Sequence, residues 1–223
     1  DNILIDMGKT EAILPPPEQI PGEVYEKGKR IKLYIAEVNT TTKGPRILVS
    51  RTHPELLKKL FELEVPEIFD GTVEIKAVSR EAGYRSKMAV TSDEENVDPV
   101  GACVGPKGMR VQAVVDQLNG EKIDIIKWND DPAELIANAL NPAEVLKVVT
   151  DEEEHEAKVI VPDFQLSLAI GKEGQNARLA AKLTGWKVDI KKESEYVFDD
   201  EKIDSEVKET SDENDELEKE GNE

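Results

Sequence analysis

The chain has 223 residues, of which 35% are charged and only 4% aromatic, so a hydrophobic core must consist mainly of aliphatic side chains. A single cysteine, Cys103, excludes an internal disulfide framework and a cysteine-cluster zinc site, and we expect no cofactor. No apolar run approaches the roughly 18 residues of a membrane-spanning helix, and no signal peptide is visible. We therefore expect a cytoplasmic protein that does not enter a membrane.

The net charge of −19 is concentrated at one end of the chain. Residues 193–223 contain 15 acidic and 3 basic side chains, whereas residues 1–192 have a net charge of only −7. Such acidic density with few apolar residues predicts a disordered tail. The tail either solubilises the chain or folds back as a mimic of nucleic acid. The body is not broadly basic, so any nucleic-acid contacts must be local.

The first part of the chain, residues 1–52, predicts four short strands. They cover residues 2–6, 11–14, 30–38 and 46–50, and they are separated by turn residues such as Gly8 and by prolines from Pro15 onward. An OB-type barrel needs about five strands. We therefore predict a partial OB-type β-barrel whose first strand is missing before Asp1, and we expect the chain to be a piece of a longer protein.

From Pro54 the spacing of apolar residues changes from that of a strand to that of a helix. This helix begins an α+β unit that we predict over residues 53–128. Five apolar residues share one face of a first helix: Leu56, Leu57, Leu60, Phe61 and Leu63. Two strands follow at 72–78 and 87–91, then two helical segments on either side of residues 105–108, and a closing strand at 122–126. The predicted order is α-β-β-α-α-β.

Residues 129–192 repeat this order. Asp131-Pro132 is a helix start, the strands cover 145–150 and 157–161, and the helical segments flank residues 171–174. Gly185 ends the last helix before a strand at 186–191, and Asp189 in that strand matches Asp124. Two copies of one unit support the prediction more strongly than either copy alone.

Each unit contains a Gly-x-x-Gly loop between two helical segments, at Gly105–Gly108 and Gly171–Gly174. Two glycines allow a sharp turn and the close approach of a phosphate, and the following helix directs free N–H groups toward it. Lys107 and Lys172 add positive charge, and the apolar helix before each loop can hold unstacked bases. This combination predicts a clamp for about four nucleotides of single-stranded nucleic acid.

Other interpretations of the loops remain. A single Gly-x-x-Gly can be a simple corner between helices, and a helix-turn-helix fits locally, although both copies run directly into strands. A P-loop is excluded because no Gly-Lys-Ser or Gly-Lys-Thr follows at the required spacing. With no Ser/His/Asp grouping either, we expect that the protein is not an enzyme.

The sequences Val-Gly-Pro-Lys-Gly-x-Arg-Val-Gln at 104–112 and Ile-Gly-Lys-Glu-Gly-Gln-Asn-Ala-Arg-Leu-Ala at 170–180 resemble the KH family in its type II order. Together with the preceding barrel, residues 1–192 are similar to the RNA-binding part of the NusA family, whose barrel is of the ribosomal S-one type. The resemblance implies a bacterial RNA-binding transcription factor, not an enzyme, that binds nascent RNA and modulates pausing, termination and antitermination. It also implies RNA polymerase as a partner of the full-length protein through a further N-terminal domain, with other elongation factors possible, and a monomeric state.

Carried over by position, the resemblance implies RNA contacts at these residues: Gly105, Pro106, Lys107, Gly108, Arg110, Gly171, Lys172, Gly174, Gln175, Asn176 and Arg178. In the barrel we nominate Lys43, Arg46 and Arg51. We expect Glu173 to face away from the phosphate, and we expect Gly105→Asp or Gly171→Asp to remove most RNA affinity without unfolding the protein. The alternative of a different class is a protein-interaction scaffold that does not bind RNA.

The remaining unusual residues favour structural roles. Cys103 is expected to be a small buried hydrophobe, and His53 to cap or pack at a junction. His155 lies in an acidic turn rather than in a metal site. Trp128 and Trp186 are expected to pack at domain interfaces, with base stacking as the alternative.

Overall fold

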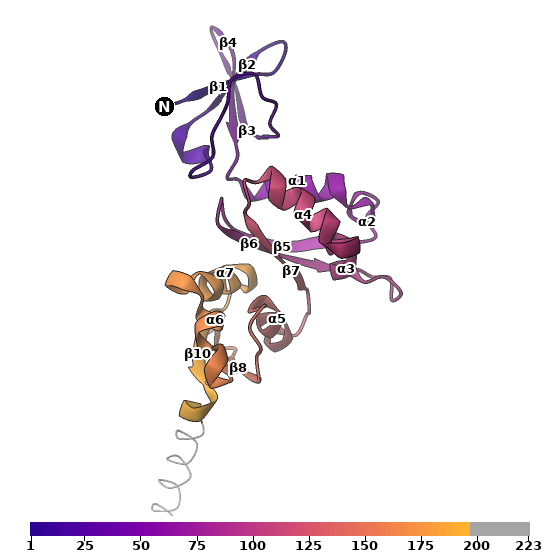
Figure 1. Cartoon of the computed structure of the whole chain (residues 1–223), viewed down its shortest axis with the longest axis vertical. Helices are drawn as coiled ribbons and strands as arrows, with labels where there is room; N and C mark the ends of the chain where they lie inside the picture. Colours follow the sequence, from indigo (N-terminus) through magenta and orange to yellow (C-terminus); the bar gives the residue numbers. More distant parts are fainter. Residues whose placement is uncertain (197–223) are drawn as a thin grey trace, which may run out of the picture.

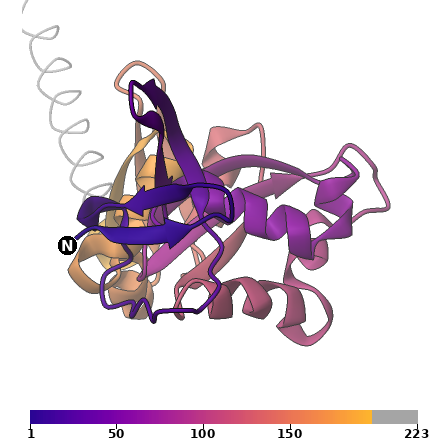
Figure 2. The ribbon, with the colours of Figure 1, turned by 90° about the horizontal axis from the view of Figure 1, so that it is seen from above.

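The computed structural model describes residues 1–196, which form three β-sheets that follow one another along the longest axis of the molecule (Figure 1). The predicted tail at 193–223 therefore lies almost entirely outside the described residues. We refer to the three parts as the N-terminal sheet (residues 1–52), the first unit (53–128) and the second unit (129–192). Figure 2 shows the N-terminal sheet in front of both units when the molecule is seen along that axis. Among residues 1–196, none of the helices has the length and apolarity needed to cross a membrane.

The N-terminal sheet has the strand order β1-β2-β4-β3. Its elements are β1 (Ile3–Asp6), β2 (Glu11–Leu14), β3 (Tyr34–Thr41) and β4 (Gly44–Ser50), with a short 3-10 turn, η1 (Pro16–Glu18), after β2. β1 and β3 form the two edges, so the sheet is open. The small core consists of Ala12, Leu14, Ile47 and Val49.

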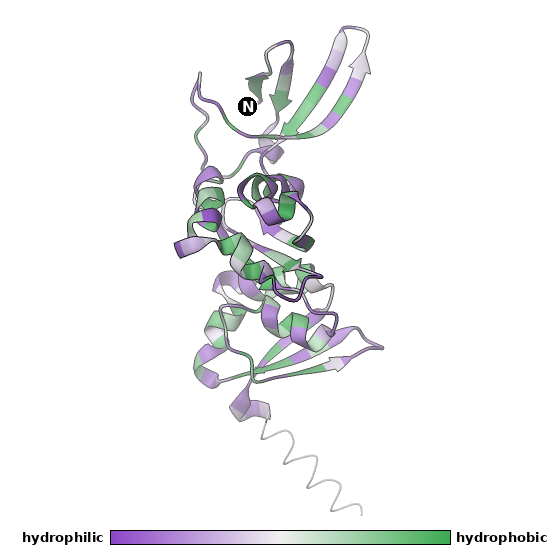
Figure 3. Ribbon diagram, turned by 90° about the vertical axis from the view of Figure 1, so that its right-hand side faces the viewer, coloured by the Kyte–Doolittle hydropathy of each residue, from purple (hydrophilic) through white to green (hydrophobic). Residues whose placement is uncertain are grey.

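The predicted strand at 30–38 was wrong at its start. β3 begins at Tyr34, which pairs with Ser50, the last residue of β4. Residues 30–33 would extend beyond the end of β4, where the chain leaves the sheet toward Pro54, so they have no ladder partner. The alternation of Ile31, Leu33 and Ile35 in this segment predicts a half-buried strand, but Ile31 and Ile35 are 37% and 48% exposed. The β3–β4 hairpin projects from the molecule (Figure 3).

The first unit confirms the α-β-β-α-α-β order. Its elements are α1 (Pro54–Glu64), α2 (Pro66–Phe69), β5 (Glu74–Glu81), β6 (Arg85–Thr91), α3 (Pro99–Val104), η2 (Pro106–Gly108), α4 (Met109–Gln117) and β7 (Lys122–Lys127). β6 lies in the centre of the sheet, antiparallel to β5 and parallel to β7. Four of the five predicted α1 residues are buried, whereas Leu63, in the last turn of α1, is 67% exposed.

The second unit repeats this topology. Its elements are α5 (Pro132–Ala139), β8 (Lys147–Asp151), β9 (Glu156–Val161), η3 (Asp163–Gln165), α6 (Leu166–Ile170), η4 (Lys172–Gly174), α7 (Gln175–Thr184) and β10 (Lys187–Lys192). β9 is central, antiparallel to β8 and parallel to β10. Asp131 caps α5 by accepting a hydrogen bond from the N–H of Ala133, and Gly185 ends α7 in a left-handed conformation, as predicted.

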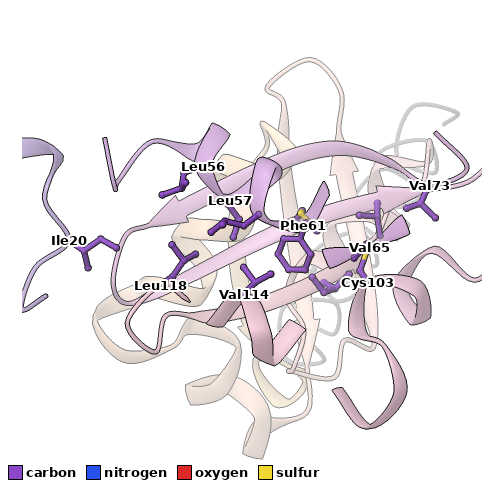
Figure 4. Close-up of a cluster of buried hydrophobic side chains, with 13 residues drawn as sticks. Ile20, Leu56, Leu57, Phe61, Val65, Val73, Cys103, Val114 and Leu118 are labelled. Atoms are coloured by element: carbon purple, nitrogen blue, oxygen red, sulfur yellow. The ribbon is translucent and has the colours of Figure 1, made fainter. Parts of the chain in front are cut away.

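The core of the first unit also holds a residue of the N-terminal part. Ile20, which follows η1, is buried in the same cluster as Phe61, Val114 and Leu118 (Figure 4). Arg51 strengthens this junction, because its guanidinium pairs with Glu23 and donates to the carbonyl oxygen of Gln117 at 2.8 Å. The N-terminal sheet is thus packed onto the first unit rather than tethered to it.

The two units share a second core. Ala77, Ala89 and Ile126 of the first unit belong to the cluster that fills the second unit. Two buried side chains add hydrogen bonds across the junction: the Ser79 hydroxyl donates to the carbonyl of Leu179 at 2.8 Å, and the Lys87 ammonium donates to the carbonyl of Asn141 at 2.7 Å. The short connection at 127–131 therefore joins two units that also pack directly on each other.

Cys103 confirms its predicted role as a buried hydrophobe. It is fully buried in the core of the first unit (Figure 4), and this burial raises the pKa of its thiol to about 12. We expect the folded protein to resist maleimide at neutral pH, because the reagent requires an accessible thiolate, and to react after unfolding in guanidinium. Mass spectrometry of the adduct measures this. Rapid labelling of the native protein would show that α3 opens readily.

Candidate nucleic-acid interface

The two Gly-x-x-Gly loops have the same backbone conformation. The first glycines, Gly105 and Gly171, have φ/ψ values of 76/170° and 79/168°, and each donates its N–H to a carbonyl in the helix that it ends, at 2.9 Å. The last glycines, Gly108 and Gly174, lie at 72/15° and 74/13°. These are conformations that L side chains rarely adopt, so glycine is required by the turn itself.

The third position of each loop is also left-handed, although it is not glycine. Lys107 has φ/ψ values of 53/26°, and Glu173 has 55/26°. Lys107 therefore corresponds to Glu173, and Lys172 corresponds to Pro106. The two loops place their lysines at different positions. Glu173 is exposed and has the backbone conformation of Lys107, so it lies as close to an approaching phosphate as Lys107 does, contrary to the expectation that it faces away.

The first glycine of each loop is also closely packed from behind. A Cβ atom on Gly105 would lie 2.6 Å from Cγ of Arg110, and one on Gly171 would lie 2.7 Å from the backbone nitrogen of Asn176. These contacts and the positive φ values predict strain in Gly105→Asp and Gly171→Asp, contrary to the expectation that both variants leave the fold intact. Loss of RNA binding in these variants would not distinguish charge from misfolding.

The helices after the loops begin without a side-chain cap. Gly108 and Gly174 are the N-cap residues of α4 and α7, and neither has a side chain that could accept a hydrogen bond from the first-turn N–H groups. The first N–H of each helix, on Met109 and Gln175, already donates to a carbonyl of the loop, so the attraction of this site for an anion rests on the helix dipole.

The side chains of both loop lysines are exposed and have no polar contact partner within the described residues. Within residues 1–196, neither the Lys107 nor the Lys172 ammonium makes an ion pair or a hydrogen bond. They can therefore approach a phosphate without giving up an existing contact.

The candidate contacts Arg110 and Asn176 occupy matching positions, five residues after the first glycine, and both turn back toward the protein. Arg110 donates to the carbonyl of Ala102 at 2.7 Å and pairs with Glu67 at 2.9 Å. Asn176 is only 3% exposed, and its amide donates to the carbonyls of Leu140 and Ala169, both at 3.0 Å. The prediction that Asn176 contacts RNA is corrected: its side chain anchors the loop from inside.

The candidate contacts Gln175 and Arg178 bind a carboxylate of the first unit. Nε2 of Gln175 lies 2.7 Å from one oxygen of Glu81, and Nε of Arg178 lies 2.6 Å from the other. Nη1 of Arg178 also donates to the Glu173 carbonyl at 3.0 Å, which holds the guanidinium beside the loop. The hydrogen bond from Arg178 holds the pKa of the Glu81 carboxyl below its usual range.

The three candidate RNA contacts in the N-terminal sheet differ in their exposure to solvent. Lys43 lies in the β3–β4 turn and Arg46 lies on β4, and both are exposed. Arg51 is 2% exposed, and all of its contacts are with the protein, including the carbonyl of Lys32 at 2.9 Å. The prediction that Arg51 contacts RNA is therefore corrected, because its guanidinium does not face solvent.

Apolar surface lies beside the second loop in particular. Leu168 and Ile170 on α6 are 45% and 37% exposed, and Phe164 on η3 is 78% exposed. Beside the first loop, Val100 and Val104 are half-buried, and Met109 at the start of α4 is 68% exposed. These surfaces can accept base faces next to a bound phosphate backbone.

The histidines and tryptophans have structural contacts. His53 caps α1, since its Nδ1 accepts the N–H of Glu55 at 3.0 Å, and its ring stacks on Tyr34. His155 stacks on the largely buried Trp186, with 4.0 Å between ring centroids, and Trp128 packs against the core of the second unit. Among residues 1–196, no three His, Cys, Asp or Glu side chains gather closely enough to hold a metal ion.

Comparison with known proteins agrees with the two-unit architecture. Residues 51–128 match the NusA-like first KH domain family, and residues 132–197 match the NusA-like second KH domain family. The transcription termination/antitermination protein NusA of Halalkalibacterium halodurans is 66% identical over 193 residues, which cover 86% of this chain and 50% of the relative. The NusA proteins of Bacillus subtilis and Mycobacterium tuberculosis are 65% and 58% identical, with 86% and 82% of this chain and 52% and 53% of the relatives covered. The chain thus spans about half the length of the curated relatives that it matches.

Proposed function

This chain belongs to the NusA family, and on that premise we propose that it is the RNA-binding part of a factor for transcription termination and antitermination. The observation that carries the proposal is the duplicated loop, in which two separate stretches of sequence adopt one backbone conformation in front of an uncapped helix. Duplication of so constrained a turn is not needed for a simple helix corner.

We propose that each loop clamps the backbone of single-stranded RNA. Gly105 and Gly108 in the first loop, and Gly171 and Gly174 in the second, let the phosphates approach the main chain closely, and Pro106 fixes the backbone of the first loop. Lys107 and Lys172 supply the positive charge. Bases then lie on the apolar surfaces before each loop. Lys43 and Arg46 extend the contacts to the N-terminal sheet.

We propose further that the three parts act as separate domains, 1–52, 53–128 and 129–192, held in one fixed arrangement. The shared cores around Ile20 and Ala89 support this, because a flexible tether would not bury side chains across a junction. One continuous RNA path then gains from effective concentration, since binding at one loop presents the RNA to the next.

In the whole protein we propose that this RNA is the nascent transcript and that the binding modulates pausing, termination and antitermination by the RNA polymerase elongation complex. Crosslinking from Lys107 and Lys172 in transcribing complexes tests the proposal. Recovery of transcript RNA at both lysines is the expected result. Recovery of protein crosslinks alone would favour the alternative, a protein-interaction scaffold.

The acidic residue in the second loop provides a direct test of the clamp. Glu173→Lys is expected to raise the affinity for single-stranded RNA about tenfold, because it replaces a repulsive charge with the residue found at the matching position, Lys107. The left-handed backbone at this position already carries a lysine in the first loop, so the fold should persist. Fluorescence anisotropy at fixed salt measures the affinity, and Glu154→Lys, in the exposed β8–β9 turn, controls for the change in net charge. Equal gains in both variants would argue against a phosphate at the loop.

A further inference from the structure

The second loop carries an internal anion that the first unit supplies. The Glu81 carboxylate, at the end of β5, accepts hydrogen bonds from Gln175 and Arg178 through different oxygens, at 2.7 Å and 2.6 Å. Both donors lie in the first turn of α7, immediately after Gly174. An anion therefore already occupies one side of the helix start at which the second loop would receive a phosphate.

The geometry resembles the capture of a phosphate. Two side chains separated by one helical turn grip two oxygens of one anionic group, and the guanidinium is oriented by a third contact, to the carbonyl of Glu173 at 3.0 Å. The carboxylate is only partly shielded, because the Arg178 and Glu81 side chains are 44% and 20% exposed. An incoming phosphate can thus reach the guanidinium if the glutamate moves aside.

The junction between the units does not depend on Glu81. The Ser79 hydroxyl, the Lys87 ammonium and the shared apolar cluster hold the first unit against the second independently. The glutamate side chain can therefore rotate away from Arg178 while both domains stay in place. Arg110 beside the first loop has a different partner, Glu67, which lies within its own unit.

We propose that Glu81 determines the RNA affinity of the second loop. Its carboxylate competes with an RNA phosphate for Arg178 and Gln175. The inference rests on the proposed function, since it assumes that RNA binds at this loop. It follows that the second loop binds RNA less tightly than its own donors allow. The first unit sets that limit.

The test measures binding of the 223-residue chain to a labelled, degenerate pool of short single-stranded RNA over a range of salt concentrations. Glu81→Gln, which keeps the shape and removes the charge, is expected to raise affinity about threefold to tenfold, as for one additional charge-assisted contact. The slope of log affinity against log salt should steepen by about 0.7, the value for one more phosphate contact on a single strand. Glu74→Gln, an exposed glutamate on the same strand, is the control and should change little.

The second arm repeats Glu81→Gln in an Arg178→Gln background, where competition predicts that the gain disappears. An equal gain in both backgrounds would overturn the inference in favour of a general charge effect. A loss of affinity would overturn it by showing that Glu81 positions Arg178 for RNA, and no change at all would also overturn it. If the unaltered chain does not bind RNA, the proposed function fails together with the inference, whereas every other adverse result removes the inference alone.

Discussion

A chain that carries both Lys107→Asp and Lys172→Asp is expected to bind single-stranded RNA roughly 100-fold more weakly than the unaltered chain, because two attractive charges become repulsive. Neither lysine makes an ion pair or a side-chain hydrogen bond within the described residues. The backbone should tolerate both changes. Lys107 has φ 53°, a region in which Asp and Asn are enriched among residues other than glycine, and Lys172 corresponds to a position that Pro106 fills in the first loop.

The matched control is Lys107→Asn with Lys172→Asn, which has almost the same shape as the aspartate variant but no negative charge. We expect it to bind about tenfold more weakly than the unaltered chain, with a flatter salt dependence, so that the two variants separate lost attraction from added repulsion. Circular dichroism and thermal unfolding check the fold of each variant. Unchanged RNA affinity in the aspartate variant would contradict the clamp and leave the protein-interaction scaffold as the better explanation.

The sequence predicted the two units well because their signals are local. Pairs of glycines, prolines that end or begin an element, and the helical spacing of apolar residues predict α3, α4, α6 and α7. Because the same features occur in both units, each copy supports the assignment of the other. The sharp turns at Gly108 and Gly174 followed from the same signals, since glycine readily adopts their left-handed backbone, whereas the left-handed Lys107 and Glu173 carry no such signal.

The roles of individual side chains were predicted less well, because they depend on contacts that are distant in sequence. Arg51 follows a strand and resembles a surface arginine, yet its acceptor on Gln117 lies 66 residues away. Asn176 lies beside a glycine loop, but its amide donates to the carbonyl of Leu140, 36 residues earlier in the chain. Glu81 could not be recognised at all, since its partner Arg178 is 97 residues further along the chain.

Register caused the remaining error, at β3. The alternation from Arg30 onward satisfies the pattern of a half-buried strand, but a strand needs a neighbour to pair with, and β4 ends at Ser50. The alternation of residues within one strand does not reveal how long the neighbouring strand is. The helix starts were easier, since Asp131 and Pro132 carry their own capping signal.

The largest loss of stability is expected from Glu121→Gln, at roughly 3–5 kcal/mol, because it leaves the fully buried side chain of Arg80 without a counter-charge. The carboxylate of Glu121 accepts hydrogen bonds from Nε and Nη2 of Arg80, both at 2.9 Å, and from the hydroxyl of Ser86 at 2.6 Å and the N–H of Gly83 at 2.9 Å. Urea unfolding followed by tryptophan fluorescence measures the change. Glu26→Gln, which breaks the exposed pair with Lys29, is the matched control and should cost less than about 0.5 kcal/mol.

The position of this pair extends its effect beyond the first unit. Nη1 of Arg80 donates to the carbonyl of His53 at 2.9 Å, at the point where the N-terminal sheet meets α1. Because His53 directly follows the N-terminal sheet, loss of this contact should loosen the start of α1, and Glu121→Gln should also weaken RNA binding at temperatures where both units remain folded. Replacing both partners, as Arg80→Met with Glu121→Leu, should recover most of the stability, because no buried charge then lacks a partner. The hydrogen bond to the carbonyl of His53 is still lost in this double variant. Full RNA affinity in that double variant would mean that Ile20 and Arg51 alone keep the RNA path continuous.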